Sequence, residues 1–364
     1  MKKIITVISL SIIYIFFLLF IFIPKKNFSE LENKALSVKP IFSISNITNG
    51  KFMEDWENYI SDHFPLKDYF LFLKTSIYRN IGIDEINDVF IAKNDYLIES
   101  YSKIDNKDSI AKSINRLAFN TNAKVYTMLI PNKIAIYKDF LPKNLEIVDQ
   151  HQEINELYKM LKTNNIDAYS ELKNNNDKYL YYKTDHHWTT LGAYYGYKAF
   201  QQATGDLYYS YGSFNVKNIS KDFLGSSYSK VLTINQAKDN IDIVSEYNNI
   251  IVNYQDTNKK TNLLYNYDYL NKKDKYSLFL DNNHSLITIV NNDVNDRSLL
   301  IIKDSFANSM IPFLVKHYNR IDIVDPRYYK KSISKYVKEN NIDDILIIYN
   351  LATLSTDRNI ESIR

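Results

Sequence analysis

The chain has 364 residues, enough for one large or two ordinary domains with a sizeable buried core. Its 45 basic and 42 acidic residues leave a formal net charge of +3, too balanced to indicate nucleic-acid binding, and the absence of cysteine excludes disulfides, thiol catalysis and zinc-thiolate sites. The 31 tyrosines fit two interpretations, stacking on sugar rings or filling core positions, and the composition leaves both open.

The N-terminus predicts a membrane anchor. Two lysines precede the uncharged residues 4–23, and Lys25 and Lys26 follow. Twenty residues at about 1.5 Å each span roughly 30 Å, the thickness of a hydrocarbon core. Because the apolar stretch ends in the bulky Phe22 and Ile23, it lacks the small-residue exit of a cleaved signal peptide. We expect an uncleaved, single-pass signal-anchor over residues 1–26 with the rest of the chain outside the cytoplasm. The charge asymmetry is modest, so the opposite orientation stays open.

Residues 27–85 carry apolar side chains at helical spacing, with Phe52, Trp56, Tyr59 and Ile60 on one face, which predicts juxtamembrane helices. Residues 86–364 form the predicted catalytic domain. It opens with a hairpin in DVFIAKNDYLIES and continues with an alternation of helices and strands. The first part of that alternation comprises a helix over 109–120, a strand over 123–131, a helix over 149–163, and a strand or its approach over 166–172.

The section from about 206 to 292 is rich in Asp, Asn and Tyr, and we interpret it as an insertion of β character. The alternation then returns: strand RSLLIIKDS, helix FANSMIPFLVKHYN, strand RIDIVDP, helix SISKYVKENN, strand DDILIIYN. Such units predict a doubly wound parallel α/β sheet, in which ligands bind at the carboxyl ends of the strands.

Polar residues follow each of these three strands. The first strand delivers Ser305 to a strand-to-helix turn, where a backbone amide and the helix dipole favour developing negative charge. The second strand ends near Arg327, and the third ends in Tyr349 and Asn350. Serine often caps helices and asparagine often ends strands, so each signal alone is common. Together they predict one rim that carries a hydroxyl, a guanidinium and a carboxamide.

The segment TDHHWTT, residues 184–190, supplies the base that a serine nucleophile needs. In an extended segment Asp185 and His187 point to the same side and His186 to the other, which leaves His186 a structural role. Two other interpretations stay open. The segment is a hydrogen-bonded turn without chemistry, or it binds a metal with His284 as a further ligand.

The sequence resembles the DHHW protein family through YYKTDHHWTTLGAYYGYKAF, followed about 120 residues later by LLIIKDSFANSMIPFL, IVDPRYY and LIIYN. That family is similar in turn to the SGNH-hydrolase-like domains of the alginate O-acetylation proteins AlgX and AlgJ. The juxtamembrane stretches FSELENKAL and KFMEDWENYISDHFPLKD share the resemblance, which therefore covers nearly the whole chain outside the β-rich section.

The resemblance implies an SGNH-hydrolase-like fold with Ser305 as nucleophile, His187 as base and Asp185 as its orienting carboxylate. Arg327 matches a second rim position, and Asn350, beside Tyr349, resembles the asparagine that assists the oxyanion hole. This chain departs from the usual Gly-Asp-Ser, because Lys303 stands in place of the glycine, and LIIYN lacks the familiar glycine beside its asparagine.

The implied activity is O-acetylation of a cell-surface or secreted polysaccharide, with a membrane-bound O-acyltransferase as the partner that supplies the acyl group. Neither a nucleotide nor a metal cofactor is implied. Two alternatives are an acetyl esterase with the same triad and a non-catalytic glycan-binding protein.

Overall fold

The computed structural model describes residues 2–363 except 144, 246 and 295. The chain divides into two compact units. The smaller comprises Met1–Asn87 and Tyr228–Gln236, and the larger comprises Asp88–Ser227 and Ala237–Arg364. The predicted segments 1–26 and 27–85 thus fall in one unit, and that unit also contains a short piece of the predicted catalytic domain.

The smaller unit is mainly helical. Its first helix, α1 (Lys2–Phe22), has a mean hydropathy of 2.9, which makes it long and apolar enough for a membrane span or a signal sequence. In α3 (Lys51–Asp62), the ring of Trp56 contacts the rings of Phe52 and Tyr59, so these aromatic residues share one face as expected. The remaining elements are β1 (Phe28–Ser29), β2 (Lys34–Ala35), α2 (Ile44–Thr48), α4 (Lys67–Asn80) and β3 (Glu85–Ile86).

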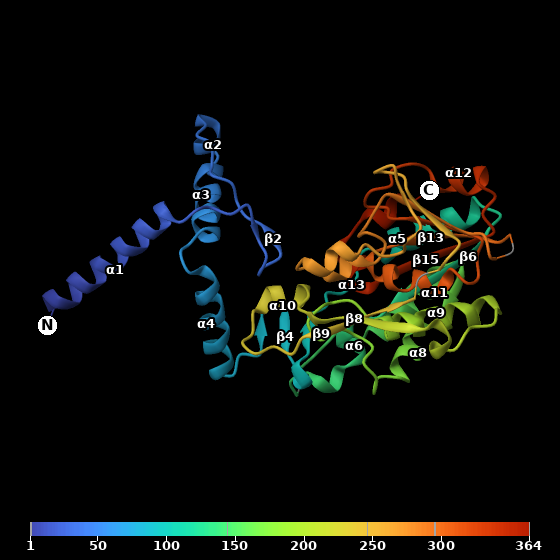
Figure 1. Cartoon of the computed structure of the whole chain (residues 1–364), viewed down its shortest axis with the longest axis horizontal. Coiled ribbons are helices and arrows are strands. Elements are labelled where there is room, and N and C mark those ends of the chain that lie inside the picture. Colours follow the sequence, from blue (N-terminus) through green and yellow to red (C-terminus); the bar gives the residue numbers. More distant parts are fainter. Residues whose placement is uncertain (1, 144, 246, 295, 364) are drawn as a thin grey trace. The chain divides into compact units, whose positions relative to one another are not determined.

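The larger unit is built on an eight-stranded sheet with the order β11-β10-β12-β14-β13-β15-β6-β7 (Figure 1). From β14 to β7 the five strands are parallel, which confirms the predicted α/β fold with its large central sheet. The other three strands add antiparallel to that edge. The expected β-rich insertion is therefore only partly separate, because three of its strands extend the central sheet. The strands are β6 (Lys124–Ile130), β7 (Asn164–Ile166), β10 (Ile250–Tyr254), β11 (Lys259–Thr261), β12 (Leu286–Asn291), β13 (Ser298–Lys303), β14 (Arg320–Val324) and β15 (Asp344–Asn350).

Core packing covers both faces of this sheet. Successive side chains of a strand alternate between faces, and β13 sends Ile301 into one hydrophobic cluster and Ile302 into another. The first cluster includes α9 (Thr190–Thr204), and the second includes α5 (Lys107–Phe119) and α7 (Gln150–Met160). Because both faces are covered, β15 is buried along its whole length, as expected of a central parallel strand. Fifteen of the 31 tyrosines are buried, so for these fifteen the structure supports the interpretation that tyrosines fill core positions.

Two predicted elements differ from the structure. The helix expected over 306–319 is a 3₁₀ turn, η6 (Ser305–Ser309), followed by the short α11 (Ile311–Leu314). Pro312 lacks an amide hydrogen and does not fit inside a helix that starts at residue 306. The strand expected over 166–172 ends at Ile166, because the Asp167 side chain accepts a hydrogen bond from the Ser170 amide and starts α8 (Ala168–Lys173).

The other elements of the larger unit follow the expected alternation or lie between its parts. The predicted hairpin is present as an antiparallel pair of β4 and β5. The bounds are β4 (Val89–Ile91), β5 (Leu97–Glu99), α6 (Lys133–Ile136), β8 (Val216–Phe223), β9 (Asp239–Val244), α12 (Ile333–Glu339) and α13 (Leu351–Thr356), while α10 (Ser226–Val231) crosses the boundary between the units.

Candidate active site

The TDHHWTT segment forms a bend, not a strand. An isolated bridge between Tyr181 and Trp188 closes the bend, and Asp185 Oδ1 accepts hydrogen bonds from the His187 amide at 3.0 Å and from His187 Nδ1 at 2.6 Å. The two side chains face each other because an aspartate readily binds the amide two residues on. The predicted alternation was wrong for His186: its ring centroid lies 3.8 Å from that of His187, and its Nδ1 lies 2.6 Å from Ser226 Oγ.

Ser305 meets this bend from the end of β13. Its Oγ lies 2.8 Å from His187 Nε2, although the two residues are 118 positions apart in the chain. The preceding Asp304 fixes the turn, because its side chain accepts hydrogen bonds from the Phe306 amide at 2.9 Å and the Asn350 amide at 2.8 Å. Among the described residues, none accepts a hydrogen bond from the Ser305 amide, so that donor can bind an oxyanion.

The electrostatics keep the imidazole neutral and the carboxylate charged. Burial, reinforced by the neighbouring His186, lowers the pKa of His187 to about 4. Burial alone would raise the pKa of Asp185, but the two adjacent histidines and the hydrogen bonds it accepts hold that pKa well below its usual range. At neutral pH the arrangement therefore presents a neutral imidazole whose Nε2 can accept the Ser305 proton and whose Nδ1 proton is held by a carboxylate.

Two buried charges hold the backbone of the bend. The Lys133 ammonium donates to the carbonyls of Leu97 at 2.7 Å, Tyr182 at 2.7 Å and Asp185 at 2.8 Å. On the amide side, the Asp239 carboxylate accepts hydrogen bonds from the Lys183 and Thr184 amides, each at 2.7 Å. Burial lowers the pKa of Lys133 to about 8 and raises the pKa of Asp239. These two residues satisfy backbone groups that would otherwise be unpaired in the core.

Comparisons with known proteins identify the family and agree with the fold. The DHHW protein family model matches residues 84–324, well over half of the chain. The chain belongs to the DHHW protein family. No curated protein matches the chain.

Solved structures share the fold. A DHHW family protein from Eubacterium siraeum superposes with a TM-score of 0.68 at 22% identity, covering 76% of this chain and 95% of that one. The structure of Bacillus cereus PatB1 with a sulfonyl adduct has a TM-score of 0.64 at 21% identity, covering 78% and 100%. The O-acetyltransferase domain of Pseudomonas putida AlgJ has a TM-score of only 0.46 at 11% identity, over 76% and 95%, too slight a likeness to support an inference.

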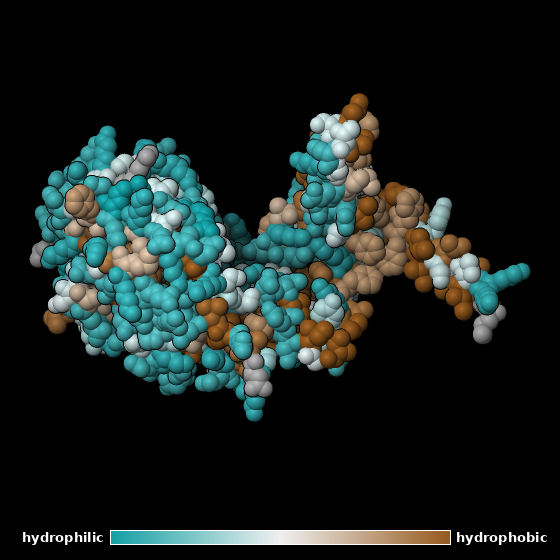
Figure 2. Space-filling model, turned by 180° about the vertical axis from the view of Figure 1, so that it is seen from behind, coloured by the Kyte–Doolittle hydropathy of each residue, from teal (hydrophilic) through white to brown (hydrophobic). Residues whose placement is uncertain are grey.

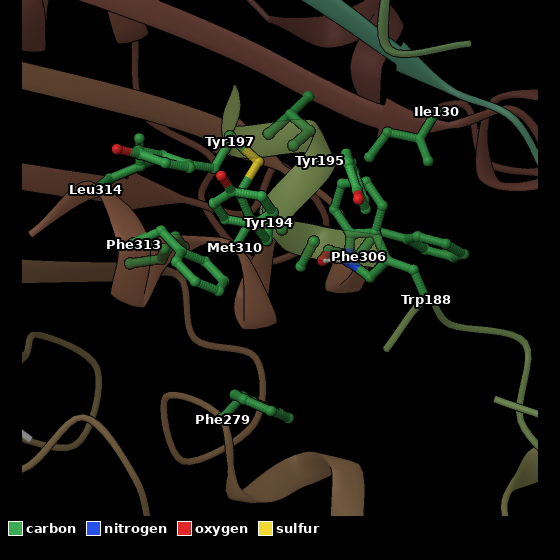
Figure 3. Packing of buried hydrophobic residues seen from close by; sticks show 14 of the residues in the cluster. Ile130, Trp188, Tyr194, Tyr195, Tyr197, Phe279, Phe306, Met310, Phe313 and Leu314 are labelled. Carbon is green, nitrogen blue, oxygen red and sulfur yellow. Dashed lines mark hydrogen bonds between the residues drawn. The ribbon is translucent and has the colours of Figure 1, made fainter. Parts of the chain in front are cut away.

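The family tryptophan has a direct contact with the serine turn. Trp188 is fully buried, and its Nε1 donates to the Phe306 carbonyl at 2.8 Å. Figure 3 shows the indole beside the Phe306 side chain within the aromatic cluster. Because Phe306 follows Ser305, this bond ties the histidine bend to the turn that carries Ser305.

Two further residues at the site were missed by sequence reasoning. The ring of Tyr276 stacks on that of His187 with centroids 3.7 Å apart, and its hydroxyl donates to the Ser305 carbonyl at 3.1 Å. Gly225 is needed for space, because a Cβ there would overlap the Asp185 side chain. The sequence could have drawn attention to Gly225, because the chain has only 7 glycines. Tyr276 is one of 31 tyrosines, so its residue type gave no indication of a role at the site.

The predicted rim residues are engaged in contacts with groups other than Ser305. Asn350 is buried, and its Oδ1 accepts hydrogen bonds from Asn132 Nδ2 at 2.6 Å and the Ala352 amide at 3.0 Å, while its Nδ2 donates to the Ile130 carbonyl at 3.2 Å. It therefore caps α13 and joins β15 to β6. Its neighbour Tyr349 is also buried, inside the second hydrophobic cluster.

Arg327 lies near the site but is committed to a buried carboxylate. Its Nε and an Nη donate to the two oxygens of Asp325 at 2.9 and 2.6 Å. Lys303, which stands in place of the family glycine, is fully buried and points away from Ser305 towards Asn283 Oδ1, 2.6 Å from its Nζ, and Asp325 at 3.6 Å. Arg327, Asp325 and Lys303 thus form an ion cluster beneath the carboxyl ends of β13 and β14.

The metal alternative has three adjacent ligand atoms, from Asp185, His186 and His187, all within 4.8 Å of one another. The further ligand considered, His284, is engaged elsewhere. Its Nδ1 contacts Asp256 Oδ1 at 2.8 Å and its Nε2 contacts the Asp281 carbonyl at 2.9 Å. It therefore does not complete a coordination sphere with the bend.

Proposed function

We propose that this protein is an extracytoplasmic O-acetyltransferase that acts on a cell-surface or secreted polysaccharide through an acyl-serine intermediate. The observation that carries the proposal is the hydrogen-bonded series from Ser305 through His187 to Asp185, with distances of 2.8 and 2.6 Å. The fold shared with PatB1 and membership of the DHHW family support it.

In the proposed reaction, Ser305 Oγ attacks the carbonyl carbon of an acyl donor while its proton passes to His187 Nε2. The Ser305 amide stabilises the oxyanion, and the departing donor group leaves with the proton from His187. A sugar hydroxyl then attacks the acyl-serine, His187 takes the hydroxyl proton, and the same proton returns to Ser305 Oγ as the ester of the sugar is released. Asp185 stays ionised throughout and orients the imidazole.

The acyl source and location belong to the same proposal. Acetyl-coenzyme A is absent outside the cytoplasmic membrane, so a membrane-bound O-acyltransferase would pass the acyl group across. The apolar helix α1 would keep this chain at that membrane as an uncleaved single-pass anchor. The identity of the acceptor, a sugar hydroxyl or water, decides between this transferase and an esterase with the same triad.

The first test traps the nucleophile. A sulfonyl fluoride is a suitable probe, because it sulfonylates activated serines and because PatB1 carries a sulfonyl adduct. We expect methanesulfonyl fluoride to add one sulfonyl group to the purified full-length protein, on the peptide that contains Ser305. Ser305→Ala should abolish labelling and hydrolysis of p-nitrophenyl acetate, whereas the exposed Ser213→Ala should change neither. Labelling of a peptide without Ser305, or ester turnover that survives Ser305→Ala, would contradict the proposal.

The second test identifies the acceptor. The protein is given an acetyl ester reporter with and without oligosaccharide, and the oligosaccharide is analysed by mass spectrometry. An increase in mass by one acetyl group that requires Ser305 supports transfer. Reporter turnover that is unchanged by the oligosaccharide, with no acetylated sugar, would instead identify an esterase.

A further inference from the structure

Helix α4 carries a stripe of exposed apolar side chains. Leu66, just before the helix, is followed by Tyr69, Phe70, Leu73, Ile77 and Ile81 at helical spacing, and these six side chains are 44% to 73% exposed. We call these six residues the α4 stripe. In Figure 2 hydrophobic surface gathers on α1 and along α4, while the face of the larger unit seen there is mainly hydrophilic.

The side of α4 that packs on its own unit is mixed, because polar side chains are buried or partly buried there beside Leu71 and Phe72. Lys67 Nζ binds Glu32 at 2.6 Å and Asp62 at 3.2 Å, and the buried Thr75 hydroxyl donates to the Val231 carbonyl at 2.5 Å. A surface helix of a soluble protein normally packs its apolar stripe on the core and leaves its polar side in water. In α4 the stripe is exposed instead, beside the exposed Asp68, Lys74 and Arg79.

This apolar exposure is concentrated in one part of the chain. Sixteen large hydrophobic residues between 27 and 87 are exposed, against eight among the described residues of the whole larger unit. Single exposed hydrophobic residues are common on proteins, but a continuous stripe marks an interaction surface. The stripe belongs to the same unit as α1.

Aromatic contacts connect the stripe to α1. The ring of Phe16 stacks on that of Phe64 with centroids 5.4 Å apart and lies 6.0 Å from that of Phe70. Phe16 precedes Ile23, the last residue of the apolar stretch, by seven positions, which is about 10 Å along a helix. In a chain anchored by α1, Phe64 and Phe70 therefore lie at about this depth below the end of the span.

We propose that the α4 stripe and the neighbouring Phe64 form a second membrane contact. Phe64, Leu66 and Phe70 enter the acyl chains of the outer leaflet, and the rest of the stripe lies along the interface. Interfacial helices bury their apolar face about 5 to 10 Å into this region, which agrees with the depth set by Phe16. The occupant of the stripe is lipid. The inference rests on the proposed anchoring by α1 and is independent of the catalytic chemistry.

The absence of cysteine makes the test direct, because each introduced cysteine is unique. Leu66→Cys and Leu73→Cys would be spin-labelled in the full-length protein, reconstituted in vesicles of phosphatidylcholine and phosphatidylglycerol. Collisions of the label with dissolved oxygen, which concentrates in acyl chains, are compared with collisions with a water-soluble nickel chelate. Ile13→Cys in α1 gives the reference for a membrane position, and Phe119→Cys, 89% exposed on the larger unit, gives the reference for water.

We expect the ratio of oxygen to nickel collisions at Leu66 to be several-fold above that at Phe119 and below that at Ile13, which lies deeper in the span, with Leu73 between Phe119 and Leu66. If Ile13 is in lipid while Leu66 and Leu73 match Phe119, the stripe faces water and the inference fails alone. If neither reagent reaches Leu66, a second protein copy covers the stripe, which also overturns it. An aqueous Ile13 would refute the anchor and this inference together, without bearing on Ser305.

Discussion

Two regions of the larger unit were expected to supply the site, and they behave differently. The bend at residues 183–188 brings Asp185 and His187 to Ser305, whereas the ends of β14 and β15 use Arg327 and Asn350 for other contacts. Both regions are rich in polar residues close to the same edge of the sheet. They differ in which neighbouring groups compete for each polar side chain.

At the bend, the backbone is satisfied from outside by Lys133 and Asp239, which leaves the Asp185 and His187 side chains available to each other. At the end of β15, the Asp304 carboxylate accepts a hydrogen bond from the Asn350 amide, but the Ala352 amide is bonded by the Asn350 side chain, which thereby caps the next helix. A polar residue at a strand end is therefore a candidate for function only after local backbone groups have been satisfied.

The largest effect on kcat is expected from a substitution in the bend, compared with a substitution at the end of β15. Asp185→Asn keeps the shape of the bend but removes the negative charge that holds the His187 tautomer, so we expect kcat for ester turnover to fall by about 10³- to 10⁴-fold. Asn350→Ala should instead lower the free energy of unfolding by about 1 to 2 kcal/mol through loss of the α13 cap and leave kcat near wild type. Steady-state kinetics and denaturant unfolding of both variants check this. Equal losses of kcat would show that the two regions share the chemistry.

A smaller effect is expected from crowding the carboxylate. In Gly225→Ala the new Cβ overlaps Asp185 and displaces it from His187, and a shift of about 1 Å can cost about 10²-fold in rate. Gly212→Ala is a matched control, because a Cβ there meets no atom within 4 Å. The readout is kcat at saturating reporter for the two variants. A Gly225→Ala protein with wild-type kcat would show that the close approach to Asp185 is not needed.

The pH dependence tests the burial of the bend. Because the pKa of His187 is lowered to about 4, the imidazole stays neutral and able to accept the serine proton down to about that pH. We expect kcat/KM to be flat from pH 6 to 8 and to fall about tenfold per unit below about pH 4, since the protonated imidazole cannot act as a base. A pH profile of reporter turnover, with unfolding followed in parallel by fluorescence, checks this. An acid limb centred near 6.5 would mean that the site is more open to water.

Much of the fold could be predicted because its signal is local. The buried runs at β13, β14 and β15, separated by helical patterns, are typical of parallel strands, and the sheet contains them in parallel. The route of residues 250–291 was not predictable in this way, because short strands rich in polar residues look the same whether they form a separate layer or extend the main sheet. Pairing across a sheet is set by contacts distant in sequence.

In the candidate site, the motif predicted which residues meet but not what holds them. Asp185, His187 and Ser305 were expected together and lie together, whereas the geometric reason is a turn at Asp185 and not strand alternation. Lys133 could not have been found from the sequence, because it is a single lysine among 45 basic residues and its role depends on three carbonyls from two distant segments.

Lys133 supports the bend from a distance, so its loss should cost less than loss of the carboxylate. Lys133→Met leaves buried carbonyls of Tyr182 and Asp185 without a donor, and we expect the free energy of unfolding to fall by about 2 to 4 kcal/mol. The Asp185 carboxylate should then be positioned less rigidly against His187, so we expect kcat to fall by about tenfold and KM to stay unchanged. Lys173→Met is the control, because within the described part of the chain Lys173 Nζ donates to a single carbonyl, that of Ile136, at 3.2 Å. Loss of stability without any loss of kcat would make Lys133 purely structural.

The smallest kinetic effect is expected at Arg327, on the strand-end side of the comparison. If the guanidinium contacted substrate, Arg327→Met would raise KM. Because both oxygens of the buried Asp325 bind this guanidinium, we expect KM to stay at the wild-type value and the free energy of unfolding to fall by about 3 kcal/mol, the lower end for breaking a buried ion pair. The loss is limited because Lys303 remains 3.6 Å from Asp325 and still compensates its charge. A raised KM with unchanged stability would instead show that Arg327 contacts substrate. It would also mean that the ion cluster opens when substrate binds.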